Sequence, residues 1–210
     1  MRAEYENVLD DHLGKIHFTY VNTWDELLPA HWHEHLEIIY VLGGEITASI
    51  NDVSYELEKG DIFLVNSNDI HYTYTHEDAR YYLLQIPPVH LERISAKWKG
   101  LKFQELIRSK SADACVQGEQ LENVQGKGLV EMRENRKSTN RADDLYDQLR
   151  DVFRKIAGFY EEKKEGYHLL VLSAVYRLLY FLYTEGIRSE EDTETCLLYT
   201  SDAADDSLRV

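Results

Sequence analysis

The chain has 210 residues, of which 43% are hydrophobic and 11% aromatic, and its formal net charge is −15. This composition excludes a disordered chain and fits either one domain or a small domain with a helical appendage. The acidity argues against DNA binding by this chain alone, because affinity for phosphates rests on clustered Lys and Arg. Its one basic cluster, Arg133–Arg141, is mixed with Glu and Asn and predicts a solvated loop.

Charged residues interrupt the long apolar stretches, and the first twenty residues hold acidic side chains instead of a basic start and an apolar run. We therefore expect no signal peptide and no membrane span. Cys115 and Cys196 lie far apart and outside any metal-type spacing. This cysteine usage fits the reducing cytoplasm and gives no disulfide framework.

Short apolar runs separated by turn residues extend from Lys15 to Pro88, which is typical of an antiparallel all-β unit. Turn residues recur at Gly43-Gly44, Asn51-Asp52 and Lys59-Gly60. Because so many short strands must protect their edges, we expect a barrel or a sandwich. The predicted strands are Lys15–Val21, His33–Leu42, Glu45–Asn51, Val53–Leu57, Asp61–Val65, His71–His76 and Arg80–Ile86.

Beyond Pro87-Pro88 the pattern changes. Val89–Arg108 is expected to be helical in part, and Ser109–Asn140 shows no sustained periodicity. Two amphipathic helices follow on either side of Gly166, which predicts an antiparallel helical hairpin. The first helix carries one apolar stripe, formed by Leu145, Leu149, Val152, Ile156 and Phe159.

The second helix is apolar over most of its circumference, so it either packs in its own core or is shared between subunits. Because a small β-barrel offers little further surface to bury against, we favour a homodimer. One stripe is formed by Val171, Val175, Leu178 and Leu182. The predicted dimer interface is the neighbouring stripe, formed by Leu169, Leu172, Tyr176, Leu179 and Tyr183.

The densest chemical signal is the segment His31-Trp32-His33-Glu34-His35-Leu36-Glu37. Side chains alternate along a strand, so the three histidines and Glu37 are expected to share one side. Imidazoles and a carboxylate that face inward can hold a divalent transition metal.

From its histidines onward this segment resembles the first cupin motif, through His31, His33, Glu37 and Gly44, although Asp25 stands where that motif has glycine. A second cupin motif is recognisable from its spacing. It runs from Gly60 to Thr75, with Asn66 in place of proline, Asn68 in place of glycine, His71 retained and Thr75 in place of asparagine. The resemblance implies four metal-type positions, at His31, His33, Glu37 and His71.

A longer stretch, from about Lys15 to Arg188, resembles the N-terminal sensor half of AraC-family regulators. The resemblance is carried by His33–Gly44, Leu57–Asn66 and His71, and by Gly166–Gly186, which is similar to the last helix of that half. It implies a cupin domain that binds a small effector, often a sugar, and paired helices that dimerise. DNA would be contacted only through a C-terminal domain that is absent here.

The resemblance implies a division into five parts. The run Cys196–Asp205 is similar to a translated sequencing adapter, so the tail from about residue 196 is expected to be an artefact of a truncated reading frame. The expected parts are an N-terminal arm (1–14), a cupin β-barrel (15–88), a partly helical connecting segment (89–142), a dimerising helical hairpin (143–188) and a tail (189–210).

Two functions remain open for the four metal-type positions. As a sensor, they would bind a polar effector such as a saccharide together with Trp32, Tyr40 and Tyr82, without catalysis and without a required cofactor. As a stand-alone cupin enzyme of dioxygenase or isomerase type, they would hold a divalent transition metal. The resemblance favours the sensor, and no nucleophile elbow or phosphate-binding glycine loop supports another reaction class.

Overall fold

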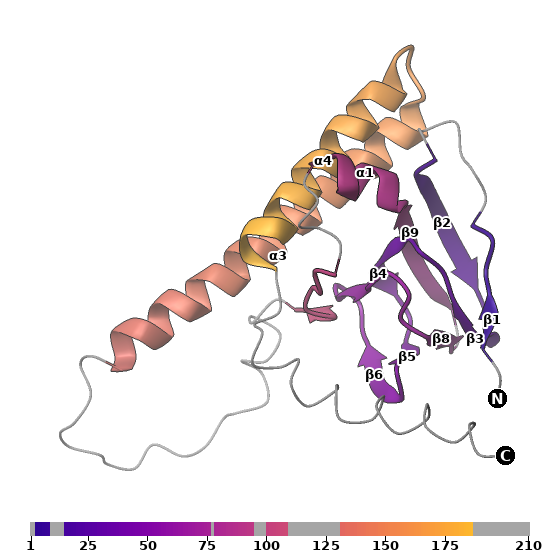
Figure 1. Ribbon diagram of the computed structural model, residues 1–210, viewed down its shortest axis with the longest axis horizontal. Coiled ribbons are helices and arrows are strands. Elements are labelled where there is room, and N and C mark those ends of the chain that lie inside the picture. The colour runs from indigo at the N-terminus through magenta and orange to yellow at the C-terminus, as the bar shows by residue number, and fades with distance from the viewer. Residues whose placement is uncertain (1–2, 9–14, 77, 95–99, 109–130, 187–210) are drawn as a thin grey trace, which may run out of the picture.

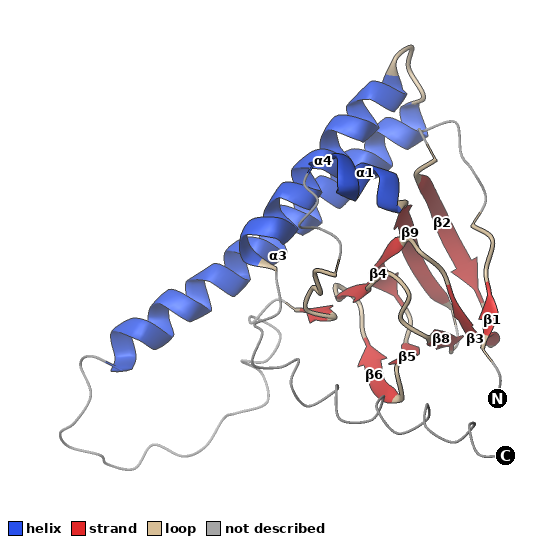
Figure 2. Ribbon diagram, viewed as in Figure 1, coloured by secondary structure: helices blue, strands red, loops and turns tan. Residues whose placement is uncertain are grey.

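The computed structural model describes residues 3–8, 15–76, 78–94, 100–108 and 131–186. It contains two five-stranded sheets that face each other, and a long helical hairpin lies along one side of them (Figures 1 and 2). This arrangement confirms the expected mainly β fold of cupin jelly-roll type with a helical appendage.

The first sheet has the strand order β1-β3-β8-β5-β6, with β1 parallel to β3 and the other pairs antiparallel. The hairpin between β5 and β6 turns at Asn51 and Asp52, whose φ angles of 46° and 70° suit a tight two-residue turn. The strands are β1 (Glu4–Tyr5), β3 (Glu26–Trp32), β5 (Ile46–Ile50), β6 (Val53–Leu57) and β8 (His71–Thr75).

The second sheet has the order β10-β7-β4-β9-β2. Its central strand, β4, is buried along nearly its whole length because both faces of this sheet are covered. The strands are β2 (His17–Thr23), β4 (Leu36–Gly43), β7 (Ile62–Val65), β9 (Ala79–Ile86) and β10 (Leu106–Ile107).

Each face of the second sheet has its own core. The face toward the first sheet packs an interior cluster that includes Ile39, Val41, Phe63, Ala48 and Ile50. Alternate residues of the same strands point the other way, toward the helices. That outer cluster joins Ile38, Tyr40, Leu64 and Leu84 of the sheet to Leu149, Phe153, Val175, Leu178 and Leu182 of the hairpin.

The helices of the described chain are α1 (Pro88–Ile94), α3 (Glu131–Glu162) and α4 (Tyr167–Glu185). α3 and α4 form the predicted hairpin, with Gly166 in a left-handed conformation between them. α3 begins well before the expected start at residue 143, so the loop expected at Arg133–Arg141 is wrong and this segment is helical. None of the described helices is long and apolar enough to cross a membrane.

The predicted dimer stripe of α4 is divided between two environments. Leu179 is 0% exposed in the outer core, and Leu172 packs against that core. Leu179 is therefore not available to a partner in this arrangement. Leu169 is 63% exposed, and Tyr176 and Tyr183 are also exposed.

Three strands were not predicted. β1 and β10 are two residues long, and β3 contains Pro29 and is mostly exposed, so none has the alternating apolar pattern of a strand. Cys115, Cys196 and the tail lie outside the described residues.

Candidate functional site

The histidine-rich segment crosses from one sheet to the other. β3 ends at Trp32 and β4 begins at Leu36, so the strand expected from His33 is interrupted by a corner. His31 therefore lies in the first sheet and Glu37 in the second. The two do not share one strand face, and Glu37 reaches the histidines across the interior through His33 and His71.

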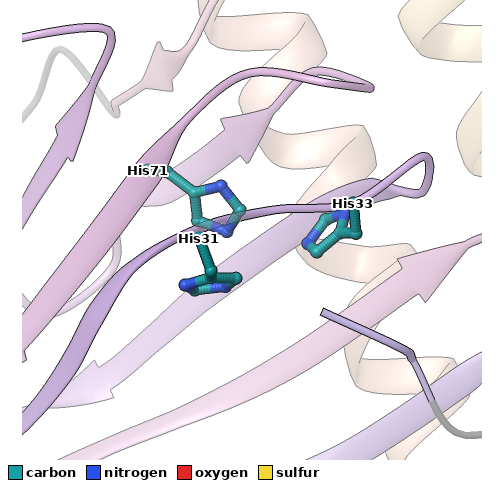
Figure 3. A group of neighbouring side chains, drawn as sticks. All are labelled: His31, His33 and His71. Atoms are coloured by element: carbon teal, nitrogen blue, oxygen red, sulfur yellow. The ribbon is translucent and has the colours of Figure 1, made fainter. Parts of the chain in front are cut away.

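His71 comes to the same place because the first residue of β8 pairs with His31 of β3. The ring centroids of His31 and His71 are 4.1 Å apart, and those of His33 and His71 are 5.0 Å apart. One ring nitrogen from each of the three histidines lies within 4.8 Å of the other two (Figure 3). His35, expected on the same side, is outside this group, although its ring contacts that of His33.

Backbone carbonyls fix the tautomers of two of these rings. Nδ1 of His31 lies 2.8 Å from the carbonyl oxygen of Pro29, and Nδ1 of His71 lies 3.0 Å from that of Asp69. A carbonyl only accepts, so in the neutral rings each Nδ1 donates and each Nε2 keeps its lone pair. Among the described residues, Nε2 of His71 is buried without a hydrogen-bond partner.

Glu37 is fully buried and is held by two donors. Nε2 of His33 lies 3.0 Å and Nε2 of Gln85 lies 2.9 Å from the same carboxylate oxygen, Oε2. Burial alone would raise the pKa of Glu37, but the hydrogen bond from His33 and the charges of His71 and His33 lower it to about 2. Glu37 is thus ionised, and its Oε2 already accepts hydrogen bonds from His33 and Gln85.

The two buried histidines respond differently to Glu37. Burial would lower the pKa of His33, but the hydrogen bond and charge of Glu37 and the charge of Glu6 raise it. Burial lowers the pKa of His71 and outweighs the attraction of Glu37. Glu37 thus favours the protonated form of His33, whereas burial favours the neutral form of His71.

The donor set fits a divalent transition metal. Three imidazoles surround one space, and the unpartnered Nε2 of His71 is the kind of buried atom that an ion would satisfy. Carbonyl-bound Nδ1 atoms are the usual support for histidines that bind metal through Nε2. An ion held by His31, His33 and His71 would polarise an oxygen of a bound ligand.

The N-terminal arm adds an unpredicted carboxylate. β1 pairs with β3 so that Glu4 is opposite His31, and the backbone N–H of Glu6 donates to the carbonyl of Trp32 at 3.0 Å. Oε2 of Glu6 lies 3.7 Å from Nε2 of His31 and 3.8 Å from Nε2 of His33. No local pattern marks this acid, because its partner strand is distant in the sequence.

Two predicted ligand residues lie on the face of the second sheet that is directed toward the helices and away from the histidines. Tyr40 packs on Phe153 of α3, with ring centroids 5.6 Å apart, and Tyr82 stacks on Phe18 at 5.3 Å. Tyr40 is three positions from Glu37, so alternation along β4 directs it away from the histidines. Both tyrosines line a separate groove with Lys59, Arg150 and Arg154.

Trp32 also points away from the cluster, because it follows His31 directly on β3. Its ring instead meets that of Tyr5 on the arm, with centroids 4.9 Å apart. Of the predicted ligand residues, the structure therefore brings together His31, His33, Glu37 and His71 only.

The chain is similar to known proteins in sequence and in fold. The family model described as "AraC-like ligand binding domain" matches residues 14–179. The search of curated proteins gave no match. Solved structures similar to this one include the conserved SPY1581 protein of unknown function from Streptococcus pyogenes, with 16% identity and a TM-score of 0.34 over 35% of this chain and 65% of that chain.

Two further similar structures carry more descriptive names. One is an RmlC-like cupin from Shewanella frigidimarina NCIMB 400, with 20% identity and a TM-score of 0.33 over 34% of this chain and 66% of that chain. The other is KdgF from Halomonas sp., with 23% identity and a TM-score of 0.33 over 34% of this chain and 68% of that chain. The chain spans about two thirds of the length of these structures.

Proposed function

The chain belongs to the family of AraC-like ligand-binding domains, and from this premise we propose that it senses a small effector for an AraC-type transcription regulator. The observation that carries the proposal is the convergence of His31, His33, His71 and Glu37 at the edge of the interior, beneath the N-terminal arm. The side chain of His31 is 16% exposed, so the cluster can be reached from solvent.

The effector is a small polar molecule, of which a saccharide is the leading class. A hydroxyl group both donates and accepts, and it would satisfy the unpartnered Nε2 of His71 while its oxygen accepts from a neighbouring ring. Gln85 and Glu37 add amide and carboxylate groups on the facing strands. A few convergent polar groups of this kind are what fixes the orientation of a small ligand.

Calorimetry with a panel of neutral sugars and sugar acids tests this function. We expect one of them to bind the unaltered protein and to lose at least about tenfold in affinity in His71→Ala, because a buried hydrogen bond is removed. His168→Ala, at an exposed histidine of α4, should bind as the unaltered protein does. If binding survives His71→Ala, the effector site lies elsewhere.

The alternative function is a metal-dependent cupin enzyme, and the grouping of three imidazoles favours it. Elemental analysis and an oxygen-consumption or isomerisation assay with added iron or manganese would separate the two. If the unaltered protein shows turnover that His71→Ala loses, and no sugar of the panel binds, then the enzyme function is supported and the sensor function is refuted.

We further propose that two copies of the chain associate through the exposed side of α4. Leu169, Tyr176, Tyr180 and Tyr183 are all exposed and recur at helical spacing, so they form one apolar stripe. A two-fold axis would place the stripe against itself, as in most homodimers. Sedimentation at micromolar concentration should show a two-chain species, and a monomer would refute the interface.

DNA recognition is assigned to a C-terminal domain outside this chain, in the cytoplasm. The net charge of −15 opposes the approach of the phosphate backbone. A gel-shift assay with the chain alone should therefore show no DNA binding. Two helix-turn-helix patterns in the next hundred codons of the gene would support the assignment, and a stop codon would favour a stand-alone cupin.

A further inference from the structure

A groove separate from the histidine cluster lies between the second sheet and α3. Tyr40 of β4 and Tyr82 of β9 line its sheet side, and residues of α3 and of the turn after β6 complete it. The turn is held to β4, because the N–H of Gly60 donates to the carbonyl of Val41 at 2.8 Å. The groove holds about 600 Å³, which is within the range of sites that bind small molecules.

Three tyrosines from three elements meet in this groove. Tyr82 is directly opposite Tyr40 in the pairing of β4 with β9, and Tyr146 joins them from α3. Burial raises the pKa of Tyr82 and of Tyr146, and the nearby Tyr40 raises both further. The hydroxyls therefore stay protonated at neutral pH and can donate. None of the three has a hydrogen-bond partner among the residues that the structure describes.

Two uncommitted cations line the same groove. Arg150 is already paired, since Nη1 lies 2.8 Å from Oδ1 of Asp147 and Nη2 lies 3.6 Å from Oδ1 of Asp151. Lys59, on the turn after β6, and Arg154, one helical turn beyond Arg150, are exposed and have no ion-pair partner within the described part of the chain. Two cations on separate elements thus border one space in a chain of net charge −15.

One acid, Glu161, lines the groove at a distance from these cations. It follows Arg154 by seven positions on α3, which is about 10 Å along the helix axis. Its charge reaches Tyr82, whose pKa it raises in addition to burial. The groove therefore suits a molecule with an anionic group at one end and hydroxyl groups that a carboxylate can accept from at the other.

Gly158 keeps the groove open on the helix side. Glycine disfavours the interior of a helix, yet Gly158 lies within α3 and lines the groove. No atom of the chain lies within 4 Å of the place that a Cβ of this residue would take. The chain's own packing therefore does not require glycine here, whereas a long side chain would occupy the space of a ligand.

We propose that this groove is a second ligand site, which binds a small phosphate monoester with a hydroxylated body, such as a sugar phosphate. A phosphate monoester carries a charge of about −1.5 to −2 at neutral pH, which matches the two uncommitted cations. Lys59 and Arg154 would bind the phosphate oxygens, the tyrosine hydroxyls would donate to the ligand, and Glu161 would accept from a hydroxyl of the body. The site is independent of the sensor function proposed for the histidine cluster.

Calorimetry in a buffer without phosphate tests the site on the full chain, with glucose 6-phosphate, ribose 5-phosphate and glycerol 3-phosphate as probes. At least one should bind, and Arg154→Gln and Lys59→Gln should each weaken that binding at least about tenfold, because one charge-assisted contact is lost. Lys155→Gln is the matched control. It removes the same charge at an exposed residue of α3 that does not line the groove, so its affinity should be unchanged.

Gly158→Leu separates a blocked groove from a damaged fold. It should weaken the binding of the same probe at least about tenfold by filling the groove, while its urea midpoint should be no lower than that of the unaltered protein, because leucine favours a helix. Unchanged binding in Gly158→Leu would overturn the placement of the ligand in the groove.

Three further outcomes would overturn the proposal. One is the absence of binding by every probe at millimolar concentration, and another is equal affinity for inorganic phosphate, which lacks the hydroxylated body. The third is binding that is lost in His71→Ala and kept in Arg154→Gln, which would place the probe in the histidine cluster. The sugar panel contains no phosphate ester, so its result tests the sensor function separately.

Discussion

Asp25 and Asn68 occupy the places where the cupin motifs have glycine, and both keep the backbone conformation that glycine would supply. Their φ angles are 47° and 66°, in the left-handed region. Aspartate and asparagine tolerate this region better than other side chains do. The departure from the motifs therefore leaves the turns beside the histidines intact, and the N–H of Asn68 still donates to the carbonyl of His33 at 2.9 Å.

Replacing Asn68 by alanine should lower the free energy of unfolding by about 1 kcal/mol, because alanine adopts a positive φ at greater cost. Asn68→Gly should be close to neutral, since glycine accepts this φ but gains entropy in the unfolded chain. Urea unfolding of both variants measures the difference. Equal losses in the two would show that the side chain of Asn68, and not its φ angle, matters.

Glu37 is expected to stabilise the fold as well as to orient His33. Glu37→Ala should lower the free energy of unfolding by about 3 kcal/mol, because it removes the buried acceptor shared by Nε2 of His33 and Nε2 of Gln85. Glu34→Ala, at an exposed acid of the same corner, should stay within about 0.5 kcal/mol of the unaltered protein. A loss in Glu37→Ala no larger than in this control would contradict the assignment.

At the scale of elements, α4 has two apolar sides with different roles. Val171, Val175, Leu178 and Leu182 are fully buried in the outer core, whereas Leu169 and Tyr180 are 63% and 61% exposed. The first set covers the chain's own sheet, and the second set lies on the exposed side through which we propose that two copies associate. One side of α4 therefore packs in the chain's own core while another stays exposed. Neither of the two alternatives, a helix wholly within its own core or one wholly shared between subunits, describes it alone.

The double substitution Leu169→Glu and Tyr180→Glu should dissociate the proposed dimer without unfolding the chain, because both side chains are exposed in the monomer. Leu179→Asp should instead unfold it, since a charge would be buried. Sedimentation and circular dichroism distinguish the two outcomes. Val53→Glu, at an exposed position on the β5–β6 hairpin, is the control and should stay dimeric. A dimer that persists in the double variant would move the interface away from α4.

Local patterns predicted most of the elements but not how the site is assembled. Turn residues and apolar periodicity were sufficient for the strands with a buried face and for the helical hairpin. Glu37 lies beside His33 and His71, but the strand face that it was predicted to share with His31 is wrong, because a corner at residues 33–35 sends the two to opposite sheets. Glu6 reaches the site because β1 pairs in parallel with β3, which is distant in the sequence. The periodicity of apolar residues cannot predict such a pairing.

For the whole molecule, the second sheet is the physical link between the site and the hairpin. Glu37 and Gln85 face the histidines, while Ile38 and Leu84 beside them face the helices. A displacement of Glu37 or Gln85 would therefore act on residues of the outer core that are their direct neighbours in the chain. Because that core is shared by sheet and helices, we expect the β-domain and the hairpin to unfold together.

Phe153 tests this cooperativity, because it is fully buried in α3 against Tyr40 of the sheet. Phe153→Ala should cost about 3 to 5 kcal/mol, as expected for a large cavity in a core. The helical signal in circular dichroism and the tryptophan fluorescence should still follow one urea transition, shifted as a unit. Phe159→Ala, at a partly buried position, should cost less than half as much. Separate transitions for the two signals would mean that the hairpin unfolds independently, and the sheet would then not carry a response from the site to the helices.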